Sequence, residues 1–264
     1  MRKNGPLALA FHTAFVGFMA APLIAIVLVS FTAKGYLSMP FDGASLRWYR
    51  ALLTAPEFGH ALRTSVLLGT GSASLALALA IPAALALARG DFPGRTALHG
   101  VLMSPLLIPN IVLGVAFLRL FNDIGLYGSF LGLLAAHCAI VLPYALRLVL
   151  GSAYGLDATL EQAAASLGAS VWTVFRRITL RLLLPGLASG WILAFIHSFD
   201  ELTMSAFIAS PSMTTLPVRI YLRIEDSIDP MVAAVSTLMI VGALALVVAI
   251  DRLVGLDRLF VGKS

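Results

Sequence analysis

The sequence predicts an all-α membrane protein with six transmembrane helices, because its composition is strongly apolar and it contains six long apolar segments. Of the 264 residues, 59% are hydrophobic and 12% are charged, whereas about 25% of the residues of a soluble domain are charged. A helix needs about 20 apolar residues to span a bilayer, because lipid offers the backbone no hydrogen-bond partner. We expect one transmembrane domain over residues 1–264, with helices at 7–31, 64–88, 100–118, 128–146, 182–209 and 231–250.

The basic residues indicate the orientation of these helices rather than a nucleic-acid surface. They give a formal net charge of +5 and mostly flank the apolar segments, where such residues are retained on the cytoplasmic side. With a cytoplasmic N-terminus, 11 of the 18 lysines and arginines lie inside. We therefore expect a multi-pass protein that contacts membrane lipid and no nucleic acid, with both termini in the cytoplasm and 151–181 as a cytoplasmic loop.

Small residues within the apolar segments have expected packing roles. Gly128 with Gly132, and Gly186 with Gly190, have the four-residue spacing that allows close contact between membrane helices. The single cysteine, Cys138, permits no intrachain disulfide and is expected to be a small buried side chain.

The cytoplasmic loop begins with a short helix that has signals at both ends. Asp157 can cap its N-terminus, which also favours the negative charge of Glu161. Good helix formers follow, and Gly168 can end the helix because glycine takes the left-handed C-cap conformation without strain. A small apolar stripe on one face is formed by Leu160, Ala164 and Leu167.

A second amphipathic piece follows, with Ser170 as its expected N-cap. Its apolar face is formed by Val171, Val174, Phe175 and Ile178. Arg176 and Arg177 are expected to face water or anionic headgroups. Two interpretations fit both pieces: a helix that docks in a groove on a partner protein, or an amphipathic linker at the membrane surface without a partner.

The spacing within this loop resembles the "EAA" signature of the membrane subunits of binding-protein-dependent ABC importers. That signature is Glu-Ala-Ala, three residues, Gly, nine residues and Ile-x-Leu-Pro, in the cytoplasmic loop before the penultimate helix. Here Ala163-Ala164, Gly168 and Ile178-x-Leu180 match it. The sequence departs from it in that Gln162 aligns with the glutamate, one place after Glu161, and Arg181 aligns with the proline.

Other segments extend the resemblance over roughly residues 40 to 240. The stretches "LRWYRALLTAPEFGHALRTSV" (46–66), "ARGDFPGR" (88–95), "SPLLIPNIVLGVAF" (104–117) and "SFDELTMSAFIASPSMTTLPVRIY" (198–221) are similar to the second permease of spermidine/putrescine-type importers. The resemblance implies a type I ABC importer permease fold in the cell inner membrane. It favours a polyamine as the solute, although similar permeases serve importers of iron(III), phosphonates, opines and other small solutes.

The resemblance also implies partners and a coupling site. The expected partners are a second, different permease chain, two ATP-binding subunits that hold ATP and Mg, and an extracytoplasmic solute-binding protein. This chain is expected to bind no cofactor and no metal. The residues expected to couple it to the ATPase are Asp157, Leu160, Glu161, Gln162, Ala163, Ala164, Leu167, Gly168 and Arg176.

Polar residues within the apolar segments are candidates for the translocation path. Asp200 and Glu201 either provide a negative lining for a cationic solute or anchor the end of a helix, because a carboxylate in hydrocarbon is costly unless it faces the bundle interior or water. His197 lies three residues before Asp200. Asn110 either lines the path or satisfies backbone groups freed by the neighbouring prolines. His137 is expected to be a packing or hydrogen-bonding residue.

The C-terminal "VGKS" (261–264) does not form a nucleotide-binding loop, because Asp257 replaces the first glycine of that motif and the required helix has no residues to form it. We therefore expect a permease subunit without its own ATPase site. Rival hypotheses are an ion-coupled secondary transporter, with Asp200 or Glu201 as the ion site, and a membrane scaffold that only recruits a partner. No catalytic cluster favours an intramembrane hydrolase.

Overall fold

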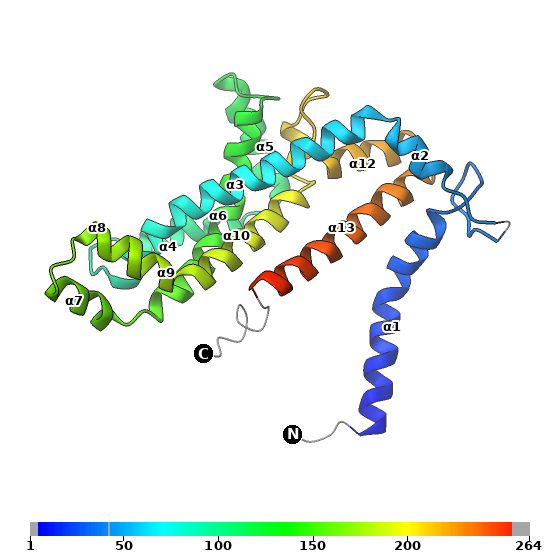
Figure 1. The fold of residues 1–264 in the computed structure, drawn as a ribbon. Coiled ribbons are helices and arrows are strands. Elements are labelled where there is room, and N and C mark those ends of the chain that lie inside the picture. Colours follow the sequence, from blue (N-terminus) through cyan, green and yellow to red (C-terminus); the bar gives the residue numbers. More distant parts are fainter. Residues whose placement is uncertain (1–4, 42, 255–264) are drawn as a thin grey trace. The chain divides into compact units, whose positions relative to one another are not determined.

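The computed structural model describes residues 5–41 and 43–254, and most of them are helical (Figure 1). Backbone contacts divide the chain into two compact units. Of the described residues, one unit contains 5–41, 43–60 and 219–253, and the other contains 61–218 and 254. The "VGKS" segment and both chain ends lie outside the described residues, so the expected cytoplasmic location of the termini stays a prediction.

The first unit contains α1 (Pro6–Val29), α2 (Arg47–Leu53), most of α12 (Leu216–Asp226) and α13 (Met231–Val254). Polar contacts connect the end of α1 to α2. Ser30 Oγ and Tyr49 OH are 2.6 Å apart, and Trp48 Nε1 donates to the Lys34 carbonyl at 3.2 Å. The turn after α12 is held by an ion pair between Arg223 and Asp229 at 2.5 Å.

The second unit contains the candidate sites. Its long helices are α3 (Pro56–Arg89), whose first turn belongs to the first unit, and α6 (Phe130–Tyr154). The remaining elements are α4 (Arg95–Met103), the 3-10 turn η1 (Ser104–Leu107), α5 (Asn110–Asp123), α7 (Ala158–Ser166), α8 (Val171–Val174), the π-helical turn η2 (Phe175–Thr179), α9 (Leu180–Leu182), α10 (Leu184–Phe199) and α11 (Ser205–Ile208).

Three of the described helices, α1, α3 and α6, are long and apolar enough to cross a membrane. Two bent pairs can each provide one more span: Arg95–Leu107 with Asn110–Asp123, bent by 103°, and Val171–Leu182 with Leu184–Phe199, bent by 65°. A shorter apolar helix covers Met231–Ala245. The count of six spans therefore stays a prediction.

Two of the expected segments are broken rather than continuous. In 100–118, α4 gives way to η1, Ile108 is extended, and α5 begins after Pro109. Pro105 and Pro109 explain the break, because proline lacks an N–H and disfavours a helical conformation in the preceding residue. In 182–209, α10 ends at Phe199, and the short helix α11 follows.

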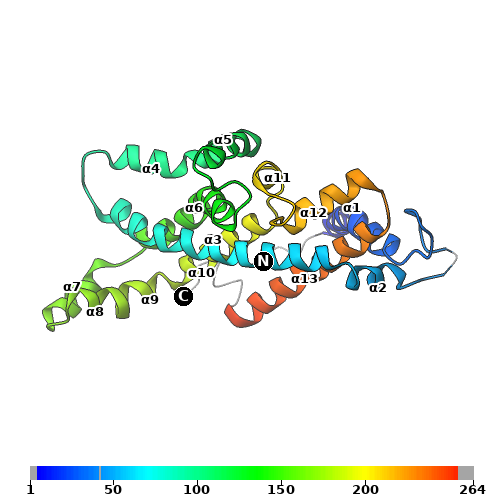
Figure 2. The ribbon, with the colours of Figure 1, turned by 90° about the horizontal axis from the view of Figure 1, so that it is seen from above.

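The core of the second unit is formed largely by buried residues of α3 and α6, and α10 runs side by side with α6 (Figures 1 and 2). A Cβ atom at Gly186 would lie 2.2 Å from Ser152 Oγ and 2.8 Å from the Leu148 carbonyl oxygen, and one at Gly190 would lie 3.3 Å from the Ala145 carbonyl oxygen. This confirms the expected close contact at Gly186 and Gly190, where missing side chains let two backbones approach.

The other glycine pair does not form a contact between helices. Gly128 lies in the loop before α6 with a φ of +67°, and a Cβ there would meet Ser210 at 2.8 Å. Gly132 lies in the first turn of α6, where a Cβ would meet the carbonyl of Leu126. The expectation for Cys138 is confirmed, because it is a free, buried cysteine in α6.

Gly186→Ala tests the contact between α6 and α10. The added methyl group collides with backbone as well as side-chain atoms of α6, so we expect the free energy of unfolding to fall by about 1–3 kcal/mol. The measurement is thermal unfolding of the purified protein in detergent. Gly151→Ala is the matched control, because a Cβ at that position of α6 meets nothing within 4 Å. Equal unfolding temperatures for the two variants would contradict the assignment.

Candidate functional site

The helix expected in the cytoplasmic loop is present as α7, and its N-terminus is capped as the sequence predicts. The side chain of Asp157 accepts a hydrogen bond from the backbone N–H of Thr159 at 2.9 Å. That bond lowers the pKa of Asp157, and a hydrogen bond from the Thr159 side chain lowers it further. The cap satisfies one of the N–H groups that the first turn of a helix leaves free.

Gly168 ends α7 in the expected manner. Its φ is +85°, in the left-handed region, and its N–H donates to the Ala165 carbonyl at 2.9 Å. The N–H of Ala169 donates to the Ala164 carbonyl at 3.1 Å, which completes a Schellman motif. Ser170 then caps α8 by accepting from the N–H of Thr173. Local sequence thus fixes both ends of α7 and the direction of the chain that leaves it.

The solvent-facing side of α7 differs partly from the expected stripe. Leu160, Gln162, Ala163 and Leu167 are exposed, with Leu167 exposed by 89%, whereas Ala164 is half-buried. We call these four exposed residues the docking surface, after the role that the sequence predicts for this helix. Val171, exposed by 88%, and Trp172 add large apolar side chains close to it in sequence. The sequence did not lead us to expect a role for Trp172, although Val171 and Val174 of the same segment were expected on its apolar face.

Glu161 does not belong to the docking surface, because it is turned toward α3. Its carboxylate oxygens accept from both terminal nitrogens of Arg89, at 2.8 and 3.0 Å, and also from the hydroxyl of Thr179. Arg89 is the last residue of α3, and Thr179 is the last residue of η2. This anchor, formed by Arg89, Glu161 and Thr179, connects α7 to two other elements. Arg176, also expected in the coupling site, is exposed on η2.

The anchor is charged at neutral pH. Burial raises the pKa of Glu161, but the hydrogen bonds from Arg89 and Thr179 and the charge of Arg89 outweigh burial, so that this pKa lies below its ordinary value. A carboxyl group with a lowered pKa stabilises the fold at pH values above its unfolded pKa. That contribution is lost as the pH falls through the pKa of the folded state. Bidentate pairing with arginine also fixes the geometry of the contact.

A second candidate site is a pocket that brings together three of the four residues expected in the translocation path. The pocket has a volume of about 80 Å³ and includes Asn110, His197 and Glu201. Its remaining lining is formed by Pro105, Leu106, Ile108, Ile140 and Tyr144. The pocket therefore lies where the expected span 100–118 is broken, next to the end of α10.

Tyr144 and His197 form one wall of this pocket. Their rings are stacked, with centroids 3.8 Å apart and planes 19° from parallel. Tyr144 was missed by the sequence analysis, and its position after Pro143 in an apolar segment was the available signal. Asn110 is the first residue of α5, and its side chain forms no hydrogen bond with the described residues. Asn110 is therefore not needed to satisfy the freed backbone of the neighbouring break.

Glu201 and Asp200 have different environments. Asp200 is the exposed C-cap residue of α10 and does not line the pocket, whereas Glu201 is buried, with 6% exposure. One oxygen of Glu201 accepts from the N–H of Met204, and the other accepts from the N–H and the hydroxyl of Ser205. Glu201 thus anchors the start of α11, as one of the two hypotheses expected, while it also lines the pocket.

A buried chain of hydrogen bonds continues from Glu201 across the unit. His137, fully buried in α6, contacts Ser205 Oγ through Nε2 at 2.9 Å and Ser198 Oγ through Nδ1 at 2.8 Å. Ser198 in turn accepts from Ser72 of α3 at 2.9 Å. This confirms the hydrogen-bonding role expected for His137. Four helices of the unit, α3, α6, α10 and α11, are held in register by this polar chain.

Comparison with known proteins identifies the family. The family described as "Binding-protein-dependent transport system inner membrane component" matches residues 1–256. The chain is 36% identical to the spermidine/putrescine transport system permease protein PotC of Haemophilus influenzae, over 90% of this chain and 93% of that protein. It is 32% identical to the putrescine transport system permease protein PotI of Escherichia coli K12, over 87% and 84%.

A solved structure shows the same fold. A chain of the bacterial alginate ABC transporter, solved in complex with an alginate pentasaccharide-bound periplasmic protein, superposes with a TM-score of 0.71. The superposition covers 94% of this chain and 93% of that chain, at 16% sequence identity. The resemblance found in the sequence and the expected all-α fold of an ABC importer permease are thereby confirmed. The chain belongs to the family of binding-protein-dependent transport system inner membrane components and is a permease subunit of an ABC importer in the inner membrane.

Proposed function

We propose that this chain is one of two permeases of a polyamine importer and that it receives mechanical work from separate ATP-binding subunits through α7. The single observation that carries the coupling role is the exposed docking surface on a helix fixed at both ends and anchored by Glu161. Small and apolar exposed side chains suit a groove on a partner. This chain contributes no ATPase site, and ATP with Mg is held by the partners.

Through the anchor, a displacement of α7 can reach the membrane-spanning helices in two ways. One route is the ion pair with Arg89 at the end of α3. The other is Thr179, from which the chain continues through α9 into α10. In the proposed cycle, closure of the ATP-binding subunits moves the two docking helices of the importer together, and the spans rock to open the path outward. Release of ADP and phosphate reverses the motion.

The residues that line the pocket with Glu201 support the proposal that the solute is a cation. A carboxylate offers about four acceptor positions, and Glu201 uses three of them within the protein, which leaves one on the oxygen that contacts Met204. The stacked Tyr144 ring adds an aromatic face, which attracts ammonium groups. The relatives named as spermidine/putrescine and putrescine permeases support a polyamine. A solute-binding protein would deliver it from outside, as in the alginate transporter complex.

Gly168→Val tests the coupling role of α7. A β-branched residue is strained at a φ of +85°, so we expect the end of α7 to rearrange and the docking surface to be displaced. In proteoliposomes that contain the whole importer, ATP-driven uptake should fall at least tenfold while the permease remains folded. Gly155→Ala is the control in the same loop, because its φ is −84° and a Cβ there makes only an ordinary contact. Uptake at the control level would refute the coupling role.

Glu201→Gln tests the cationic path, because it removes the charge at the pocket. We expect uptake of spermidine or putrescine by the reconstituted importer to fall at least tenfold, since a neutral amide binds an ammonium group more weakly than a carboxylate does. Ser205→Ala is the control that disturbs the same hydrogen-bond chain without changing the charge. Equal losses of uptake in both variants would show that Glu201 is only structural. If no polyamine stimulates the ATPase activity of the importer, the solute is a different one.

A further inference from the structure

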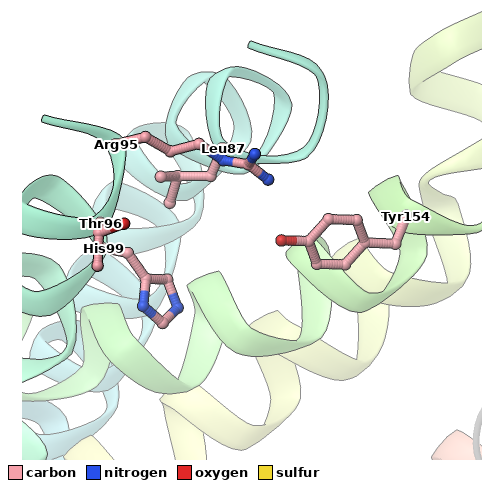
Figure 3. A pocket seen from close by; sticks show the side chains of 5 residues that line it. All are labelled: Leu87, Arg95, Thr96, His99 and Tyr154. Carbon is pink, nitrogen blue, oxygen red and sulfur yellow. The ribbon is translucent and has the colours of Figure 1, made fainter. Parts of the chain in front are cut away.

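A second pocket shares no residue with the one that contains Glu201 and is lined by Leu87, Arg95, Thr96, His99 and Tyr154 (Figure 3). Its volume is about 240 Å³, several times the 30 Å³ or so that one water molecule occupies in the liquid. Leu87 comes from the end of α3, Tyr154 is the last residue of α6, and the other three lie in the first half of α4. Three helix ends therefore meet around one space.

The lining is rich in hydrogen-bond donors and contains no carboxylate. Figure 3 shows the guanidinium group of Arg95, the ring of His99 and the hydroxyl of Tyr154 turned toward the same space. Within residues 5–41 and 43–254, the side chain of Arg95 forms no ion pair and no hydrogen bond. An arginine without a partner beside hydroxyl and imidazole donors matches the chemistry of a phosphate group, whose oxygens accept several such bonds at once.

The surroundings of the pocket favour a lipid as the source of that phosphate. Arg95 and His99 lie one turn apart on α4, and two apolar side chains are exposed on the same helix: Leu98, which lies between them in the sequence, and Val101, which lies beyond them and is exposed by 67%. α4 therefore presents donors at its start and apolar side chains further along, as a helix does where it passes from the headgroups into the hydrocarbon. The distribution of basic residues predicts that this end lies on the cytoplasmic side, where anionic lipids attract arginine.

We infer that the pocket between α3, α4 and α6 binds the phosphate group of an anionic membrane lipid, with Arg95, His99 and Tyr154 as its donors. A bound phosphate would hold together three helix ends that border the coupling loop. α3 ends at Arg89 of the anchor, and Tyr154 precedes α7 by four residues. The inference does not depend on the transported solute, because it concerns a different pocket and different side chains.

Native mass spectrometry of the assembled importer, taken from nanodiscs of defined composition, tests this inference. Phosphatidylglycerol and phosphatidylcholine are offered in separate arms, and a third arm offers inorganic phosphate in phosphatidylcholine nanodiscs. We expect Arg95→Gln to weaken phosphatidylglycerol binding about tenfold and Tyr154→Phe, which keeps the ring, to weaken it severalfold. Arg119→Gln is the control for charge, because Arg119 is exposed on α5 and pairs with Asp123.

The outcomes distinguish a lipid headgroup from free phosphate as the source of the bound phosphate group. Binding of phosphatidylglycerol that depends on Arg95 supports the lipid, whereas binding of inorganic phosphate alone that depends on Arg95 supports the phosphate chemistry with a soluble source. If neither ligand depends on Arg95, or if Arg95→Gln and Arg119→Gln lose the same amount of phosphatidylglycerol, the site is refuted. A photo-crosslink from position 95 to an acidic segment of an ATP-binding subunit would refute it as well.

Discussion

The proposed coupling function depends on the ion pair between Arg89 and Glu161. Without it, α7 would be connected to the rest of its unit mainly through the chain on either side, since its outer face is exposed. A helix of nine residues has little stability of its own in water. The bidentate contact with Arg89, together with the contact to Thr179, attaches α7 to α3 and η2. In the proposed mechanism, a force on the surface of α7 is passed to these two elements through the attachment.

α10 extends this connection to the pocket that contains His197 and Glu201, the proposed translocation site. The short helix α9 continues from η2, and α10 begins two residues after α9 ends. The 16 residues of α10 span about 24 Å. His197 and Glu201 lie at its far end and line the pocket, while Gly186 and Gly190 press its first half against α6. The tight contact favours movement of α6 and α10 together. The buried chain from Glu201 through His137 to Ser72 brings α3 into the same body.

Features set by neighbouring residues were predictable from the sequence. Asp157, Gly168 and Ser170 define the ends of α7 and the start of α8, because caps depend on a few adjacent residues. The close contact between helices at Gly186 and Gly190 was also predicted correctly. Gly128 and Gly132 have the same spacing, but they lie at the start of a helix and form no such contact. Spacing alone does not distinguish a packed face from a helix terminus.

Features that depend on distant contacts were not predictable. Glu161 was expected to couple this chain to the ATPase, but its ion pair was not predicted, because its partner Arg89 lies 72 residues away in the chain. Tyr144 reaches the pocket only because α6 and α10 pack together. The prolines at 105 and 109 signalled irregular backbone, yet the 103° bend depends on how the following helix packs. The adjacent carboxylates Asp200 and Glu201 have different environments because α10 ends at Phe199, so that Asp200 is its exposed C-cap while the buried Glu201 belongs to the turn before α11.

The most direct test of the account is a double-mutant cycle of Arg89→Gln and Glu161→Gln in the reconstituted importer, with the number of ATP molecules hydrolysed per solute transported as the readout. The account predicts that each single variant raises this number severalfold and that the double variant is no worse than either, because both remove the same contact, worth about 1 kcal/mol for a partly exposed pair. Unchanged coupling in the single variants, or additive losses in the double variant, would contradict it.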